Sequence, residues 1–157
     1  MKEQHGFTVL ELMVVVAIVV TVLAITTLSF MRMNQKYRVE SSIKEIYSTL
    51  MQARNDATLT NIPSRVRVSA QEISVLRDTN EDGDTDGQGE NVSRQYAPFI
   101  LTGTGDIVFN RRGFAAVNRI IRITNYPDKV NPAMDCLVVS ATRINMGKWD
   151  GTNCVQR

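Results

Sequence analysis

Histidine is nearly absent from this sequence: the only one is His5, and the chain beyond Gly6 has none. Without histidine, the rest of the chain cannot run a Ser-His or Cys-His mechanism or build a His-ligated zinc site. Carboxylate or lysine chemistry stays open, but no paired set of such residues stands out. We therefore predict that the protein is not an enzyme.

Charge is missing from Phe7 to Phe30, with one exception, Glu11. At 1.5 Å per residue, a helix over this run is long enough to cross a hydrocarbon core of ~30 Å. We therefore predict a transmembrane helix at 7–30. Placing a charged carboxylate in lipid costs free energy. We therefore predict that Glu11 has a function and pairs with another group.

The polar residues come before the apolar run, in a six-residue leader that reads MKEQHG. A secretory signal peptide has its cleavage site after the apolar region. Cleavage after Gly6 would instead leave the apolar helix on the mature protein as an anchor. An uncleaved single-span anchor is the alternative.

The residues GFTVLE at this junction resemble the class III signal of type IV pilins and pseudopilins. The resemblance implies that a prepilin peptidase cuts after Gly6 and methylates Phe7, the new N-terminal residue. It also implies that Glu11 meets the N-terminal amine of a neighbouring subunit. The charge would then be costly in a lone subunit and paired in a filament, which favours assembly.

Residues 31–62 continue the helix in amphipathic form, because apolar side chains recur at spacings of three and four. The predicted helix runs from about Thr8 to about Leu59, and Asn61-Ile-Pro63 is its stop signal. Two helices broken near Ser29 are the alternative. The apolar stripe consists of Val39, Ile43, Ile46, Tyr47, Leu50, Ala53 and Ala57.

For residues 63–157 we predict short strands separated by glycine and proline turns, which together form a domain called here the head. The first two strands pair antiparallel across residues 69–72. The fold class is α+β, with one long helix packed on an antiparallel sheet. The predicted strands are Arg65–Val68, Ile73–Leu76, Val92–Phe99, Asp106–Phe109, Arg119–Thr124 and Cys136–Ser140.

The order of motifs in the head narrows the resemblance to the FimT/GspH family of minor pilins and type II secretion pseudopilins. A D-x-N-x-D-G turn at 78–83 precedes a G-E-x-V segment at 89–92. The segment 106–109 with Gly113 follows, and 136–140 closes the series.

The only two cysteines, Cys136 and Cys154, lie 18 residues apart near the C-terminus. If the head is periplasmic, they lie in an oxidising compartment. Many pilins have a C-terminal disulfide loop, so the resemblance favours a bridge closing the loop 136–154. Two buried or free thiols are the alternative.

The segment 78–90 holds six acidic residues and no basic ones. Its oxygens fall at positions 1, 3, 5, 7 and 9 of an EF-hand-like calcium loop, with glycine at position 6. The twelfth position is Gly89 where a bidentate Glu is expected, so a solvated hairpin loop is favoured and calcium is the alternative. The candidate ligands are Asp78, Asn80, Asp82, Asp84 and Asp86.

The chain from Asn91 to Arg157 holds nine Lys and Arg against four Asp. Some FimT-like pilins bind DNA through a C-terminal Gly-Arg-x-Arg motif, of which Thr142-Arg143-Ile144-Asn145 keeps one arginine. Arg143 is thus a candidate DNA contact, although scattered surface charge is the favoured interpretation.

These observations predict a minor pilin at the tip or in the priming complex of a type IV pilus. It would be anchored in the inner membrane by a single pass, with a periplasmic head, and its partners would be other pilin subunits and the prepilin peptidase. The alternatives are an H-type pseudopilin of a type II secretion system and a DNA-binding minor pilin.

Overall fold

The computed structural model of the chain describes residues 7–77, 91–127 and 129–156. For residues 25–29, 91 and 92 it describes the backbone and not the side chains.

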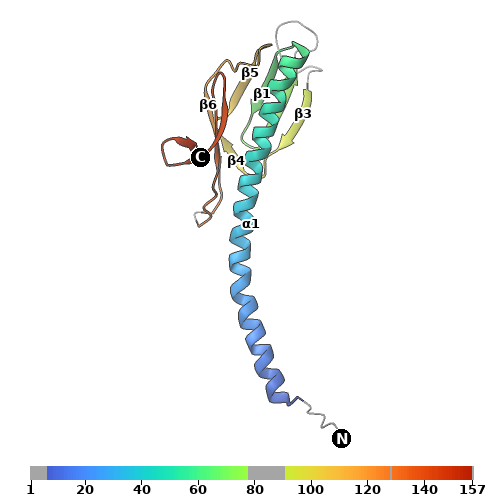
Figure 1. The fold of residues 1–157 in the computed structure, drawn as a ribbon, viewed down its shortest axis with the longest axis vertical. Coiled ribbons are helices and arrows are strands. Elements are labelled where there is room, and N and C mark those ends of the chain that lie inside the picture. The colour runs from blue at the N-terminus through green and yellow to red at the C-terminus, as the bar shows by residue number, and fades with distance from the viewer. Residues whose placement is uncertain (1–6, 78–90, 128, 157) are drawn as a thin grey trace.

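One helix, α1 (Val9–Thr60), accounts for a third of the chain and has a length of about 78 Å. Its C-terminal half lies on the head, and its N-terminal half extends beyond the head as a stalk (Figure 1). Asn61 caps the helix in the left-handed conformation, with φ 57°, two residues before Pro63. This confirms the predicted extent of the helix and its stop signal, and the helix continues through Ser29 without a break.

The predicted apolar stripe of α1 forms the centre of the head. Six of its members are no more than 2% exposed, and Tyr47 is half-buried against them. The six are Val39, Ile43, Ile46, Leu50, Ala53 and Ala57. Because their spacing places them on one face, the opposite face of the helix stays in solvent.

In the part of the chain that the structure describes, nine antiparallel strands form two sheets, both of which contribute to one core with α1. Sheet A has the order β3-β2-β1-β5 and sheet B the order β4-β6-β7-β8-β9. Sheet A consists of β1 (Ser64–Val68), β2 (Glu72–Arg77), β3 (Asn91–Tyr96) and β5 (Gly105–Phe109). Sheet B consists of β4 (Ile100–Thr102), β6 (Arg119–Thr124), β7 (Cys136–Val139), β8 (Ile144–Trp149) and β9 (Cys154–Gln156).

Ion pairs join the central strand β1 of sheet A to its edge strand β5 on the outer side of the sheet. Arg65 Nη1 and Arg67 Nε of β1 each lie 3.1 Å from a carboxylate oxygen of Asp106 in β5. Partial burial of Asp106 opposes ionisation, but the hydrogen bonds and charges of Arg67 and Arg65 outweigh it and hold the pKa of Asp106 below its usual range.

The α+β class and the first antiparallel pair agree with the sequence prediction, and Val66 pairs with Val75 across β1 and β2. The prediction of Val92–Phe99 was too long at its end, since β3 stops at Tyr96 before Pro98. Three strands were missed, namely β4, β8 and β9, and with them the division into two sheets. They are short or contain glycine, so alternation of polar and apolar residues is weak in them.

The described residues contain no helix that combines the length and hydropathy needed to cross a membrane. The predicted segment 7–30 includes residues 25–29, whose side chains lie outside the description.

Candidate functional site

The N-terminus of α1 is built by Thr8 and Glu11. Thr8 has extended backbone angles, and its Oγ1 accepts a hydrogen bond from the backbone N–H of Glu11 at 3.2 Å. This is the N-cap arrangement, and Thr-x-x-Glu is the sequence of a capping box. Glu11 lies in the first turn, where the helix dipole favours a negative charge. The role of Thr8 was not predicted from the sequence, although the Thr-x-x-Glu pattern at residues 8–11 indicates a capping box.

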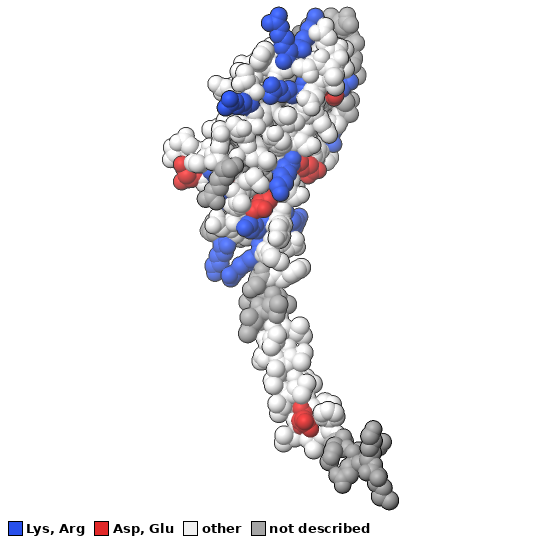
Figure 2. Space-filling view, in the orientation of Figure 1, with Lys and Arg blue, Asp and Glu red and all other residues white. Residues whose placement is uncertain are grey.

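Apolar side chains cover the whole circumference of α1 beyond Thr8. Leu10, Leu12 and Met13 are 73%, 61% and 67% exposed, and high exposure continues to Leu23. A helix that is apolar on all sides needs lipid or other apolar helices around it. The isolated chain therefore presents an unpartnered helical surface on which Glu11 is the only charge among the described side chains (Figure 2).

The stalk contains polar groups that are satisfied locally. Thr21 Oγ1 donates to the backbone carbonyls of Ala17 at 3.1 Å and Ile18 at 2.8 Å. This back-bonding lets a hydroxyl lie in an apolar helix without an outside partner. The Glu11 carboxylate cannot be satisfied in this way, because an ionised carboxylate only accepts hydrogen bonds and cannot donate to a helix carbonyl.

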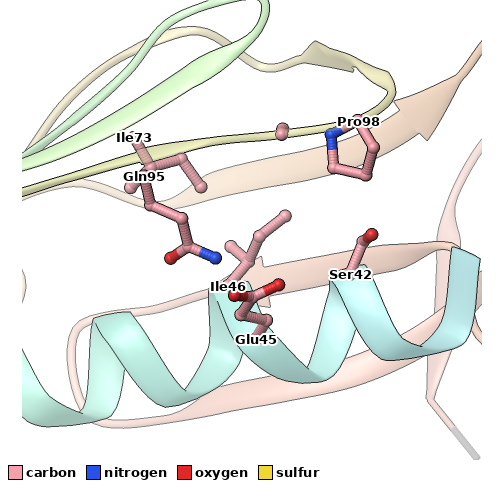
Figure 3. A pocket seen from close by; sticks show the side chains of 7 residues that line it. Ser42, Glu45, Ile46, Ile73, Gln95 and Pro98 are labelled. Carbon is pink, nitrogen blue, oxygen red and sulfur yellow. The ribbon is translucent and has the colours of Figure 1, made fainter. Parts of the chain in front are cut away.

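Side-chain hydrogen bonds join the head to α1 at several points along their contact. Near the stalk, the Glu40 carboxylate accepts a hydrogen bond from the backbone N–H of Ala133 at 2.7 Å. Farther along, Thr49 Oγ1 donates to the Gln95 side chain of β3 at 3.0 Å. Between these points a cavity lies between α1 and β3, lined by Ser42, Ile46 and neighbours (Figure 3). Its water-accessible volume of about 10 Å³ is at the limit for one water molecule, so it is a packing defect and not a ligand site.

The disulfide between Cys136 and Cys154 is present, which confirms the predicted bridge. It joins β7 to β9, which both flank β8, and Cys136 pairs with Gly147 of β8. Strands on either side of a third lie about 9–10 Å apart in a flat sheet. The Cα atoms of the two cysteines are 6.0 Å apart, so β9 must fold over β8.

The glycine at position 147 allows β9 to lie this close to β8. A Cβ at residue 147 would lie 2.4 Å from the carbonyl oxygen of Val155 and 2.9 Å from the sulfur of Cys154. Only glycine leaves room for β9 at this position.

A buried carboxylate, Asp135, lies beside the disulfide. It accepts hydrogen bonds from Tyr126 Oη at 2.6 Å, Lys148 Nζ at 2.9 Å and the backbone N–H of Trp149 at 2.6 Å. Burial, the hydrogen bond to Asp135 and the charge of Asp135 together raise the pKa of Tyr126 well above its usual range. Arg122 lies over the ring of Trp149, 4.8 Å from its centroid. The Asp135 carboxylate is thus satisfied by its three donors, whereas the buried Nε of Arg122 has no hydrogen-bond partner among the described residues.

Two of the predicted sites fall partly or wholly outside the described residues. Gly6 precedes the first described residue, whereas Phe7 is described and is 83% exposed. All the candidate calcium ligands lie in 78–90, outside the description, so calcium binding stays a prediction. Among the described residues, no group of three or more His, Cys, Asp or Glu is placed to hold a metal ion.

Arg143 lies in the turn between β7 and β8, at the end of the head far from the stalk, and is exposed. Arg54 of α1 donates to the carbonyl oxygen of the preceding residue, Thr142, at 2.9 Å. The structure contains no DNA, so the proposed contact of Arg143 with DNA also stays a prediction.

Two family models match the chain. The prokaryotic N-terminal methylation motif matches residues 1–27, which covers the leader, Thr8, Glu11 and most of the apolar half of α1. The type II transport protein GspH matches residues 42–142, which covers the head-packed part of α1 and the strands from β1 to β7. Neither a curated protein nor a solved structure matches the chain. Since the second model covers more than half of the sequence, the chain belongs to the GspH family of type II transport proteins, with the N-terminal methylation motif of pilin-like subunits.

Proposed function

We propose that this protein is a minor pilin, a structural subunit at the tip or in the assembly-priming complex of a type IV pilus. A prepilin peptidase cuts it after Gly6 and methylates Phe7. The observation that carries the proposal is Glu11, the single carboxylate on the N-terminal, apolar half of α1, where apolar side chains are exposed on every side.

Assembly solves the problem that this surface poses. In the inner membrane, the apolar half of α1 anchors the chain and lipid covers its side chains, but the charge of Glu11 lacks a counter-charge. When subunits pack, the helices cover one another, and the new amine of Phe7 on a neighbour supplies a cation for Glu11. Pairing of an otherwise uncompensated buried charge favours the filament over the lone subunit and fixes the register between subunits.

A second candidate is the H-type pseudopilin of a type II secretion system. The GspH match favours it, because that family model is named for type II transport. The mechanism of assembly at Glu11 would be the same in both systems, whereas the neighbouring subunits would differ.

Processing is the first test. We expect co-expression with a prepilin peptidase to yield a membrane-associated product that begins with N-methylated Phe7, as read by mass spectrometry. The variant Gly6→Val should keep the whole leader. A product that keeps MKEQHG in the presence of an active peptidase would contradict the proposal. Identification of the subunits that co-purify with the processed chain would then decide between a pilus and a secretion pseudopilus.

A further inference from the structure

Three cations lie on α1 at the point where the stalk enters the head. They are Arg32, Lys36 and Arg38, called here the neck cations. Arg32 and Arg38 are exposed, and the Lys36 side chain is 44% exposed. They occupy about 9 Å of helix length. At 100° per residue, Arg32 and Lys36 lie about 40° apart on one side of the helix, and Arg38 lies on another side. Figure 2 shows basic side chains gathered where the head narrows into the stalk.

The acidic groups near the neck cations do not cancel them. The sequence has no Asp or Glu between Glu11 and Glu40. Glu40 is only 12% exposed, lies 3.9 Å from Lys36 Nζ and already accepts a hydrogen bond from Ala133. The Arg38 guanidinium lies over the ring of Phe99 at 6.0 Å, and it forms no ion pair with a carboxylate of the described residues. The neck therefore carries a net positive charge.

The neck cations begin two residues after the apolar segment ends at Phe30. A bilayer has a polar layer of roughly 5–8 Å on each side of its hydrocarbon core. If the apolar half of α1 lies in that core, the neck cations lie in the headgroup layer. Phe30 and Tyr37, at 62% and 60% exposure, flank the same level, and aromatic side chains favour this interface.

The compartment makes these cations unusual. The disulfide of the head indicates an oxidising compartment, so the neck is on the translocated side of the anchor. Lys and Arg close to a span are normally concentrated on the cytoplasmic side. Three of them on the opposite flank oppose insertion in this orientation, which indicates that they gain a local anionic partner.

We propose that the neck cations bind the headgroups of anionic phospholipids in the outer leaflet of the inner membrane, and so hold the head against the bilayer before the subunit is extracted. This proposal depends on the proposed function in one respect, namely that α1 anchors the chain. Cations on two sides of α1 suit this partner because a helix that crosses a membrane meets headgroups on all sides. Attraction of this kind falls off within a Debye length, so it ends when the helix is extracted.

The test uses the full processed chain with Tyr37→Trp, reconstituted into vesicles of phosphatidylcholine with or without phosphatidylglycerol. A lipid with a nitroxide on its headgroup quenches tryptophan at the interface, and the signal of the parent chain, from Trp149, is subtracted. Each cation near an anionic surface changes binding roughly fivefold, so three cations change it on the order of 100-fold. We expect stronger quenching with phosphatidylglycerol, and loss of this difference in about 1 M salt.

The variant Arg32→Gln, Lys36→Gln and Arg38→Gln should quench equally in both vesicles, and glutamine keeps the helix propensity. The matched control removes three exposed arginines of the head, Arg94, Arg111 and Arg112, and should keep the difference. Equal quenching of the parent in both vesicles would overturn the proposal. If the parent quenches equally in both vesicles and the neck variant also fails to enter filaments, the neck cations contact another subunit and not lipid. That result would overturn the proposal as well. Failure of the chain to float with either vesicle would instead refute the anchor, and the proposed function with it.

Discussion

Thr8 Oγ1 accepts a hydrogen bond from the backbone N–H of Glu11 at 3.2 Å, so the hydroxyl two residues after the predicted cleavage site starts the helix. This contact places the backbone of Glu11 in the first turn of α1. If cleavage occurs after Gly6, the amine of Phe7 is adjacent to the cap, and α1 begins with its charged groups in a defined place.

The first prediction concerns this cap. Thr8→Ala should destabilise the first turn by about 1 kcal/mol, because it leaves the N–H of Glu11 without its acceptor. Amide hydrogen exchange in detergent micelles should then be roughly fivefold faster at Glu11. Thr8→Ser keeps the hydroxyl and should exchange like the parent. Equal exchange in Thr8→Ala and the parent would show that the cap does not hold this turn.

A second prediction concerns the close contact between β9 and Gly147 of β8. Gly147→Ala should lower the free energy of unfolding by about 1–3 kcal/mol, since its methyl group would collide with Val155 and Cys154. Urea unfolding of the full chain in detergent measures this. When both cysteines are replaced by serine and β9 can move away, the same change should cost less. An equal cost in the two backgrounds would mean that the disulfide does not press β9 onto Gly147.

Residues with a regular pattern were predictable, and residues whose position depends on distant contacts were not. The stripe from Val39 to Ala57 has helical spacing, and all of its buried members were identified in advance. The roles of Asp135 and Gly147 were not predicted. Nothing in the local sequence indicates that a carboxylate will be buried beside Tyr126, or that another strand will lie against a glycine. Their roles arise from the pairing of β7, β8 and β9, which lies beyond local sequence. Thr8 is different, since its capping pattern was local and was overlooked.

The third prediction concerns the disulfide itself. Replacing Cys136 and Cys154 by serine removes the constraint on an 18-residue separation and should lower the free energy of unfolding by roughly 3 kcal/mol. Urea unfolding of the oxidised parent, the reduced parent and the double serine variant measures this. The last two should be alike, and a double serine variant as stable as the oxidised parent would refute the prediction.

The fourth prediction is a dependence on alkaline pH. Because folding raises the pKa of Tyr126, the folded chain keeps the tyrosine proton at a pH where the unfolded chain has lost it. The associated stability is fully present below the ordinary tyrosine pKa of about 10 and falls as pH rises above it.

Tyr126→Phe removes this titration, so the difference in stability between parent and variant should be constant from pH 7 to about pH 9. Above about pH 10 the parent should lose stability relative to the variant. Urea unfolding of both proteins across this range measures the difference. A constant difference up to pH 11 would mean that Tyr126 titrates normally in the folded chain.

The most direct test of the account is incorporation of Glu11→Ala into filaments, compared with Glu45→Ala on the same helix. Glu45 is an exposed carboxylate on the part of α1 that lies on the head, so its removal is the matched control. The fraction of processed subunit recovered in sheared filaments is measured by immunoblot, with the membrane-bound fraction as reference. We expect Glu11→Ala to be processed and membrane-bound but incorporated at least about tenfold less, which corresponds to about 1.4 kcal/mol, while Glu45→Ala incorporates normally. Equal incorporation of Glu11→Ala and the parent would contradict it.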